Sequence, residues 1–442
     1  MKTIFISSFH QLISRNILAT PLLELLLQSG DIRIVILVPA DKQNFFQSEF
    51  GRDGIVIEGV PRTLTPRDFL LRYFALSSVT ARGIEVIRKK EYDNFNSRFL
   101  RVLGRRAWGQ GLIREIDKWL TPRGRFGALL DKYQPALIFS TDAQNENDVR
   151  LMHEARARGI RIFGMVRSWD NFTTKGALRI ISDTLAVTSE IVKREAEAFS
   201  FVPEARIVPI GIPHYDRYLQ RSKMPREEFY RSLGLDAAKK TILFAPIGNR
   251  YIRDNLLDKI VLESLAILDV NVLVRMPPSD YVNFENWKKG RANVVFYTPG
   301  GGSPSGDKDR KLNEVTREDD NHLIAELTHC DIVVTGQSTI TIDAMMFDKP
   351  AVIIYFDQEE RQYYESIKRY YDSEYYRPVV ESGGVQLARS SEELKTFVER
   401  YLENSRLDEE GRRRIASEQA YKIDGKATER LAQVLLSSLR AA

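Results

Sequence analysis

The stretch VVTGQSTITIDAMMFDKPAVIIYF (residues 333–356) decides the fold of this chain. It begins and ends with short apolar runs that are typical of buried strands, and residues 338–347 between them have the length of a helix. A strand, a helix and a second strand in this order form one step of a parallel sheet, because parallel neighbours need a crossover connection. The stretch therefore predicts an α/β fold.

The same alternation continues in both directions from this stretch. Runs typical of strands lie at residues 3–8, 32–38, 136–141, 160–166, 184–188, 205–210, 241–246, 270–276 and 293–298. Strands that are apolar on both faces indicate parallel sheets covered by helices on both sides. We expect two doubly wound, Rossmann-like domains facing a cleft, with ligands at the carboxyl ends of the strands.

The domain boundary is expected in the polar, helical segment near residues 215–240. We predict a first domain at 1–215 that binds the acceptor and a second at 216–420 that binds a nucleotide donor. Long helices are expected at 391–404 and 407–437, and a closing helix within 421–442 should pack back on the first domain.

Composition excludes several classes of protein. The chain has 442 residues, 43% of them hydrophobic and 28% charged, and no apolar run approaches the roughly 20 residues of a membrane span. Its single cysteine favours a reducing compartment, and residues 1–10 do not resemble a signal peptide. We expect a cytoplasmic protein, with the inner face of the membrane as an alternative. The net charge of +5 suits anionic ligands, and no nucleic-acid-binding module is recognisable.

Residues 69–126 are expected to form a basic helical insertion in the first domain. Within it, residues 98–125 carry eight Arg and Lys against two acids, together with Trp108 and Trp119. One interpretation is a pair of amphipathic helices docked on the domain. The other is peripheral contact with an anionic membrane or a lipid-linked substrate.

The turn at the start of the 338–347 helix is the predicted site for the donor phosphates. The free N–H groups of a helix start, with the helix dipole, attract an anion. Ser338 and Thr339 add hydroxyls there, and the backbone of Gly336 and Gln337 allows close approach. Asp343 is placed to bind a ribose. The alternative is a capped turn that binds nothing.

Two further residues are predicted on the donor side. Arg275 ends a strand, so its guanidinium can chelate a phosphate, with a structural salt bridge as the alternative. Asn249 lies in the loop after the first strand of the second domain. We expect no metal and no cofactor other than the nucleotide-sugar donor, because the Asp-Lys-Asp at 307–309 lies in a Gly/Pro/Ser-rich loop.

On the acceptor side, polar side chains follow two strands of the first domain. Asp142, Gln144 and Asn145 follow the strand at 136–141 and suit sugar hydroxyls, with a solvated helix start as the alternative. The stretch RSWDNFTTKG (167–176) follows the next strand. From it we assign acceptor binding to Ser168, Trp169, Asn171 and Lys175.

A glycosyltransferase that inverts the configuration at the anomeric carbon needs a base to take the proton of the acceptor hydroxyl. Asp170 is one candidate, with a capping carboxylate as the alternative. His10, in the loop after the first strand, is the other, with a locally hydrogen-bonded histidine as the alternative. The sequence does not choose between them.

Several segments resemble the CDP-glycerol glycerophosphotransferases that make teichoic-acid-type polymers. The segment at 335–350 resembles their donor site, with Asp348 where that family has Gly. The segments at 207–219, 239–250 and 424–431 agree in order with other family segments, and the first of these implies a donor-side role for Gly211. The resemblance implies the GT-B architecture, which sugar-nucleotide 2-epimerases share.

Two departures bear on the reaction. The family carries His where this chain has Asp170, and again where it has Pro277 in the segment Arg275–Pro278. These changes favour transfer of a sugar to a surface-polysaccharide or lipid-linked glycan acceptor over transfer of a polyol phosphate. A 2-epimerase and a non-catalytic nucleotide-binding protein remain alternatives.

Overall fold

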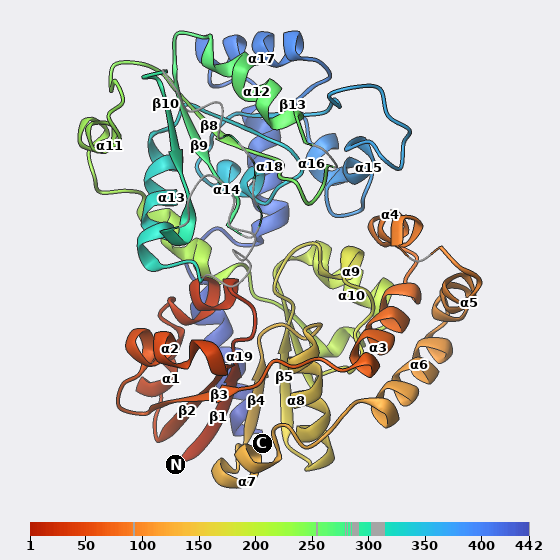
Figure 1. The fold of residues 1–442 in the computed structure, drawn as a ribbon. Helices are drawn as coiled ribbons and strands as arrows, with labels where there is room; N and C mark the ends of the chain where they lie inside the picture. The colour runs from red at the N-terminus through yellow and green to blue at the C-terminus, as the bar shows by residue number, and fades with distance from the viewer. Residues whose placement is uncertain are drawn as a thin grey trace. The chain divides into compact units, whose positions relative to one another are not determined.

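The computed structural model describes residues 1–91, 93–252, 255–278, 280, 282, 284, 291–301 and 314–441 (Figure 1). The chain forms two compact units. The first comprises Met1–Asp216 and Gln419–Ala442, and the second comprises Arg217–Glu418.

In its described part, the first unit contains a parallel sheet of seven strands in the order β3-β2-β1-β4-β5-β6-β7. The strands are β1 (Lys2–Ser7), β2 (Ile32–Pro39), β3 (Ile55–Val60), β4 (Leu137–Ser140), β5 (Arg161–Met165), β6 (Thr184–Val187) and β7 (Ile207–Pro209). The strand order reverses between β1 and β4, which makes that edge the topological switch point.

The second unit repeats this arrangement. The sheet found in its described residues has six parallel strands in the order β10-β9-β8-β11-β12-β13, and the order reverses between β8 and β11. The strands are β8 (Thr241–Ala245), β9 (Asn271–Arg275), β10 (Val294–Tyr297), β11 (Ile332–Thr335), β12 (Ala351–Ile354) and β13 (Val385–Ala388). The predicted fold class of two doubly wound α/β units is confirmed.

The helices follow the strands in both units. Those of the first unit are α1 (Leu22–Gln28), α2 (Gln43–Phe50), α3 (Pro66–Ser77), α4 (Arg82–Glu91), α5 (Phe95–Gly104), α6 (Ala107–Leu120), α7 (Gly127–Tyr133), α8 (Glu146–Ala157), α9 (Asn171–Thr174), α10 (Glu190–Ser200) and α19 (Ala427–Arg440). Those of the second are α11 (Arg226–Leu233), α12 (Leu257–Ala266), α13 (Arg317–His329), α14 (Ile340–Met346), α15 (Lys368–Tyr371), α16 (Arg377–Glu381), α17 (Ser391–Glu403) and α18 (Glu409–Ala420). No helix in these described ranges is both long and apolar enough to cross a membrane.

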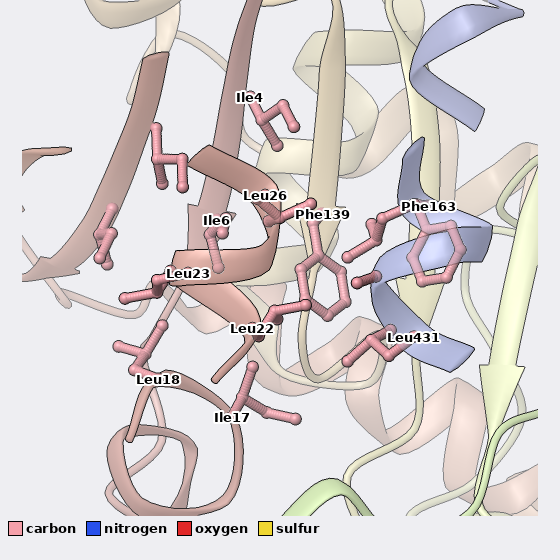
Figure 2. Close-up of a cluster of buried hydrophobic side chains, with 14 of the residues drawn as sticks. Ile4, Ile6, Ile17, Leu18, Leu22, Leu23, Leu26, Phe139, Phe163 and Leu431 are labelled. Atoms are coloured by element: carbon pink, nitrogen blue, oxygen red, sulfur yellow. The ribbon is translucent and has the colours of Figure 1, made fainter. Parts of the chain in front are cut away.

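The prediction of one helix over 407–437 was wrong. The chain leaves the helical conformation between α18 and α19, where Tyr421 and Gly425 have φ angles of 62° and 72°. This break lets α19 turn onto the first sheet. Figure 2 shows Leu431 of α19 in the buried cluster with Leu22 of α1 and Phe163 of β5.

Residues of two family-like segments hold α19 in place. Asp216 accepts the N–H groups of Ala427 and Thr428 at 3.0 and 2.8 Å, so it caps the helix from a distant part of the chain. Gly211 has a φ of 88°, and a Cβ there would lie 3.1 Å from Ala427 Cβ. The structure therefore places Gly211, predicted on the donor side, in the first unit against α19.

Candidate active site

Three loops bring the predicted acceptor-side residues together at the switch point of the first sheet. β1 and β4 are neighbours, as are β4 and β5. His10 lies in the loop after β1, Asp142 follows β4, and residues 167–175 follow β5. The carboxyl ends of parallel strands lie at the same edge of a sheet. His10, Asp142 and residues 167–175 therefore lie at one edge of the first sheet.

Asp142 forms an ion pair with Arg167, a residue to which the sequence assigned no role. Arg167 Nε lies 3.3 Å from Asp142 Oδ2, and the two side chains are 10% and 5% exposed. Burial by itself would raise the pKa of Asp142, but Arg167 and, after it, Lys175 and His10 lower the pKa below its ordinary value. Asp142 is therefore ionised at neutral pH.

Asp170, one of the two predicted bases, directly precedes α9. Thr174 Oγ1 donates to its Oδ2 at 2.8 Å, and Lys175 Nζ lies 3.8 Å from its Oδ1. Burial would raise the pKa of Asp170, but Lys175 and hydrogen bonds to the carboxylate lower it to about 2. The side chain is thus a firmly ionised hydrogen-bond acceptor.

His10, the other predicted base, is neutral. The N–H of Leu12 donates to its Nδ1 at 3.2 Å, so the ring proton lies on Nε2. Burial and then Arg167 lower the pKa of His10 to about 3, while Asp142 opposes the shift. His10 therefore offers a hydrogen-bond donor at Nε2.

Most of the other predicted acceptor-binding residues hold the loops together. Asn171 Oδ1 accepts from the Ser168 N–H and from Lys175 Nζ, both at 2.9 Å. Its Nδ2 donates to Gln144 Oε1 at 2.7 Å. Asn145 caps α8 through its side chain, which is the alternative that the sequence left open.

The edge as a whole can orient a hydroxyl group. Two cations, Arg167 and Lys175, balance the carboxylates around them. Asp170 can accept a hydrogen bond from a hydroxyl, and His10 can donate one to it. Trp169 is only 7% exposed, so its ring contributes to packing more than to a binding surface.

The predicted donor-binding residues lie at the switch point of the second sheet. Gly336 directly follows β11, and Asn249 lies in the loop after the neighbouring strand β8. A Cβ at position 336 would lie 2.5 Å from Ile247 Cγ1, so the two loops pack too closely for a side chain. Asp258 fixes the β8 loop by accepting the Ile247 N–H at 2.8 Å.

The hydroxyl groups that precede α14 do not cap it. Thr339 is the N-cap residue, its side chain is exposed, and in the described structure it makes no capping hydrogen bond. Ser338 is partly exposed beside it. The N–H groups of Thr341 and Ile342 already donate to Ser338 O at 3.1 Å and to Thr339 O at 2.8 Å, so this turn offers mainly the two hydroxyl groups as donors.

Three tyrosines to which the sequence assigned no role brace this turn. The hydroxyl groups of Tyr376, Tyr375 and Tyr218 donate to Gly336 O at 3.1 Å, Gln337 Oε1 at 2.8 Å and Asp343 Oδ1 at 3.1 Å. Gln337 and Asp343, both predicted to bind the donor, are therefore also part of the internal structure of the second unit.

Arg275, predicted to bind the donor phosphates, forms a buried ion pair. Its Nη1 lies 2.6 Å from Glu326 Oε2, and Glu326 is fully buried. Its guanidinium also lies 5.3 Å from the centre of the Tyr297 ring. This is the structural alternative left open by the sequence, and we do not retain Arg275 as a donor ligand.

Metal independence remains a prediction. The Asp-Lys-Asp segment at 307–309 lies outside the described residues. Within them, no three His, Cys, Asp or Glu side chains gather as a metal site requires.

A family comparison identifies the class of this chain. The model of the family named CDP-Glycerol:Poly(glycerophosphate) glycerophosphotransferase matches residues 171–437. The chain belongs to this family. This glycerophosphotransferase-family protein is therefore a transferase with the GT-B fold, as its sequence resemblance implied.

Solved structures share the fold at low identity. A putative UDP-N-acetylglucosamine 2-epimerase from Listeria monocytogenes has a TM-score of 0.57 at 13% identity, covering 100% of this chain and 98% of the other. The wall teichoic acid polymerase TagF has a TM-score of 0.53 at 12% identity, covering 100% and 89%. A glycosyltransferase from Rickettsia africae has a TM-score of 0.50 at 9% identity, covering 100% and 99%. Comparison with curated proteins found no match.

Proposed function

We propose that this protein transfers a polyol phosphate from a nucleotide-activated donor to an acceptor during synthesis of a cell-envelope polymer. The family match carries the proposal, since residues 171–437 include the whole second unit. The donor phosphates would bind at Gly336–Thr339, where open α/β sheets bind their ligands. The acceptor hydroxyl would bind at the carboxyl edge of the first sheet.

In this proposal, Asp170 and His10 share the acceptor hydroxyl. Asp170 accepts its hydrogen bond and takes the proton as the hydroxyl oxygen bonds to the polyol-phosphate phosphorus and the bond from that phosphorus to the nucleotide phosphate, which leaves, breaks. Nε2–H of His10 donates to the same oxygen and fixes its direction. Lys175 holds Asp170 in the ionised form that this role requires.

Transfer of a sugar is the second candidate. It is favoured by Asp170 and Pro277, which stand where the resembled family has His. Mass spectrometry of the product decides between the two, because only polyol-phosphate transfer moves phosphorus from the donor to the acceptor. Turnover of a nucleotide sugar without any acceptor would instead indicate an epimerase.

Both transfer reactions require a nucleotide-activated donor, so nucleotide binding tests them together. A thermal-shift panel of CMP, CDP, UDP, GDP and ADP should contain one stabilising nucleotide. At about 100 times its dissociation constant, it should add about 2.7 kcal/mol to the free energy of unfolding. No shift with any nucleotide would refute both transfer reactions, and binding without turnover would indicate a non-catalytic homologue.

We further propose that α5 and α6 touch an anionic membrane. Phe95, Trp108 and Trp119 are 82%, 68% and 79% exposed. On α6, Trp108, Leu112 and Trp119 share one helix face because they are four and seven residues apart. Exposed arginines at 105 and 106 supply charge complementary to anionic lipid.

Vesicle flotation tests this contact. The protein should float with vesicles that contain phosphatidylglycerol and much less with pure phosphatidylcholine. The double variant Trp108→Ser, Trp119→Ser should lose this binding. A matched control, Leu256→Ser with Ile267→Ser, removes side chains that are 58% and 62% exposed in the second unit and should bind normally. Equal loss in both double variants would contradict the proposal.

A further inference from the structure

Asn171 is a fully buried residue at the predicted acceptor edge. It is the first residue of α9. Its Oδ1 accepts hydrogen bonds from the Ser168 N–H and from Lys175 Nζ, both at 2.9 Å. The Asn171 side chain therefore joins the loop that precedes α9 to the lysine that follows this helix.

The orientation of the Asn171 amide follows from its partners. Gln144 Nε2 donates to Gly176 O at 2.5 Å, so the other amide atom of Gln144, Oε1, is an acceptor. Asn171 Nδ2 lies 2.7 Å from that Oε1 and donates to it. Asn171 Oδ1 therefore faces Lys175, because the reverse orientation would place two donors against each other there.

The carbonyl group that orients Gln144 is fixed by α3. Gly176 has a φ of 93°, and a Cβ at this position would lie 2.7 Å from Leu76 N of α3. The N–H of the next residue, Ala177, donates to Ala75 O at 3.0 Å. These backbone contacts give the hydrogen bonds from Gly176 to Asn171 a rigid starting point.

Lys175 is the cation whose position these hydrogen bonds determine. Its Nζ lies 3.8 Å from Asp170 Oδ1, and its side chain is 27% exposed. An ammonium on a flexible stem with this exposure can turn towards water unless an acceptor holds it. Burial raises the pKa of Asp170, and Lys175 is the charge that opposes this most, followed by Arg167. The charge of Lys175 also acts on Asp142 and His10.

The helices packed against α9 carry other charged side chains. On α4, Arg82 Nη1 lies 3.0 Å from Glu85 Oε2. On α10, Glu195 is 7% exposed. Lys175 and Arg167 act on Asp170 more strongly than these groups, so Lys175 is the charge whose placement matters most.

We propose that Asn171 is a positioning residue, which holds the Lys175 ammonium beside the Asp170 carboxylate. Gln144 supports this role by orienting the Asn171 amide. The inference rests on the proposed function only in naming Asp170 as the base. Asn171 is buried and acts through Lys175, whose charge keeps Asp170 ready to accept the proton of the acceptor hydroxyl.

Two measurements on the full chain without any substrate test this role. The first follows the Asp170 carboxyl carbon by NMR in protein labelled at aspartate, with Asp170→Asn identifying its signal. At pH 4 the parent carboxyl, with a pKa of about 2, should be about 1% protonated. Asn171→Ala should raise this fraction about tenfold or more, because the released ammonium no longer opposes the effect of burial.

The second measurement is the rate at which acetic anhydride acetylates Lys175, with peptide mass spectrometry reporting each lysine separately. In Asn171→Ala the ammonium loses a charge-assisted hydrogen bond, so acetylation of Lys175 relative to Lys193 should rise about tenfold. Lys193 is the internal reference, since its side chain is 21% exposed and its Nζ lies 2.9 Å from Glu204 Oε1.

A double-mutant cycle distinguishes positioning from a general effect on folding. Lys175→Met removes the ammonium and should protonate Asp170 as Asn171→Ala does, and the double variant should show no more protonation than Lys175→Met alone. Asn145→Ala is the matched control, because this amide caps α8 at the same edge and its loss should change neither readout. Gln144→Ala keeps Asn171 but removes its partner. It should give smaller changes in the same direction, and it tests the role independently if Asn171→Ala does not fold.

Unchanged protonation of Asp170 at pH 4 in Asn171→Ala would overturn the inference, as would an additive effect in the double variant. Unchanged acetylation of Lys175 would overturn it as well. Neither readout needs a nucleotide or an acceptor, so these outcomes are independent of the proposed function. If no nucleotide stabilises the chain while both readouts change as expected, Asn171 still positions Lys175 and only the naming of Asp170 as a base fails.

Discussion

Asp148 provides the sharpest test of the electrostatics of the first unit. It lies on α8, is fully buried, and accepts hydrogen bonds from the hydroxyl groups of Ser7 and Ser140. Burial and then the nearby Asp142 raise its pKa to about 7, although these hydrogen bonds oppose the shift. Asp148→Asn keeps the accepting oxygen and removes the ionisation.

The magnitude follows from the change in pKa on folding. Folding raises the pKa of Asp148 from 3.8 to about 7. At about 1.4 kcal/mol per unit, this corresponds to about 4 kcal/mol. The folded state binds the proton more tightly, so the free energy of unfolding falls as the pH rises from about 4 to about 7 and stays reduced above. Asp148→Asn should match the parent near pH 4 and be more stable by up to about 4 kcal/mol near pH 8.

Urea unfolding between pH 4 and pH 8 measures this difference. Tryptophan fluorescence reports mainly on the first unit, because Trp108, Trp119 and Trp169 lie there among the four tryptophans of the chain. Asp131→Asn, at a side chain that is 72% exposed, is the control and should show no pH-dependent difference. A constant difference between Asp148→Asn and the parent from pH 4 to pH 8 would refute the reasoning.

Three other substitutions test the fold and the donor site. Asp216→Ala removes the acceptor for two N–H groups at the start of α19 and should lower the free energy of unfolding by about 1–2 kcal/mol in urea; an unchanged value would contradict the cap. Asp348 has a φ of 53° and its Oδ1 lies 2.8 Å from Arg412 Nε, so both Ala and Gly lose the ion pair. Only Asp348→Ala keeps a side chain in the left-handed region, and it should be less stable than Asp348→Gly by about 1 kcal/mol in thermal unfolding. Gly336→Ala should cost about 1–3 kcal/mol, because its Cβ would lie 2.5 Å from Ile247, and should weaken nucleotide stabilisation in the thermal-shift panel; an undiminished nucleotide shift would count against the donor site.

The sequence predicted the architecture because the governing signals are local. Apolar runs on both faces of β8 and β11, with helices between strands, are sufficient to indicate parallel sheets. The helix over 407–437 was mispredicted because the left-handed backbone at Tyr421 is not marked by its residue type, and the turn signal Asp424-Gly425 was not used. The residues predicted for the candidate sites follow strands, and the structure places those strands at the switch points of the two sheets.

Individual roles were harder to predict because the partners are distant in the chain. Arg275 meets Glu326, 51 residues later, and becomes part of a buried ion pair. Gln337 meets Tyr375, 38 residues later. An arginine at a strand end or an amide in a turn looks the same in sequence whether it binds a ligand or forms an ion pair or hydrogen bond inside the protein. Only the tertiary structure distinguishes the two cases.

The two departures from the resembled family now differ in meaning. Pro277 is partly exposed just after β9, and its side chain can neither hydrogen-bond nor carry a proton, so nothing at this position replaces the histidine. Asp170 stays partly exposed at the acceptor edge, with a pKa of about 2. An imidazole at position 170 could be a base near neutral pH, whereas this carboxylate is ionised across that range. The chemistry of this chain should therefore depend little on pH above about 4, and an activity profile that falls on acidification only below about pH 4 is expected if Asp170 is the base. A midpoint near pH 6.5 would instead indicate a titrating histidine and exclude Asp170 from that role.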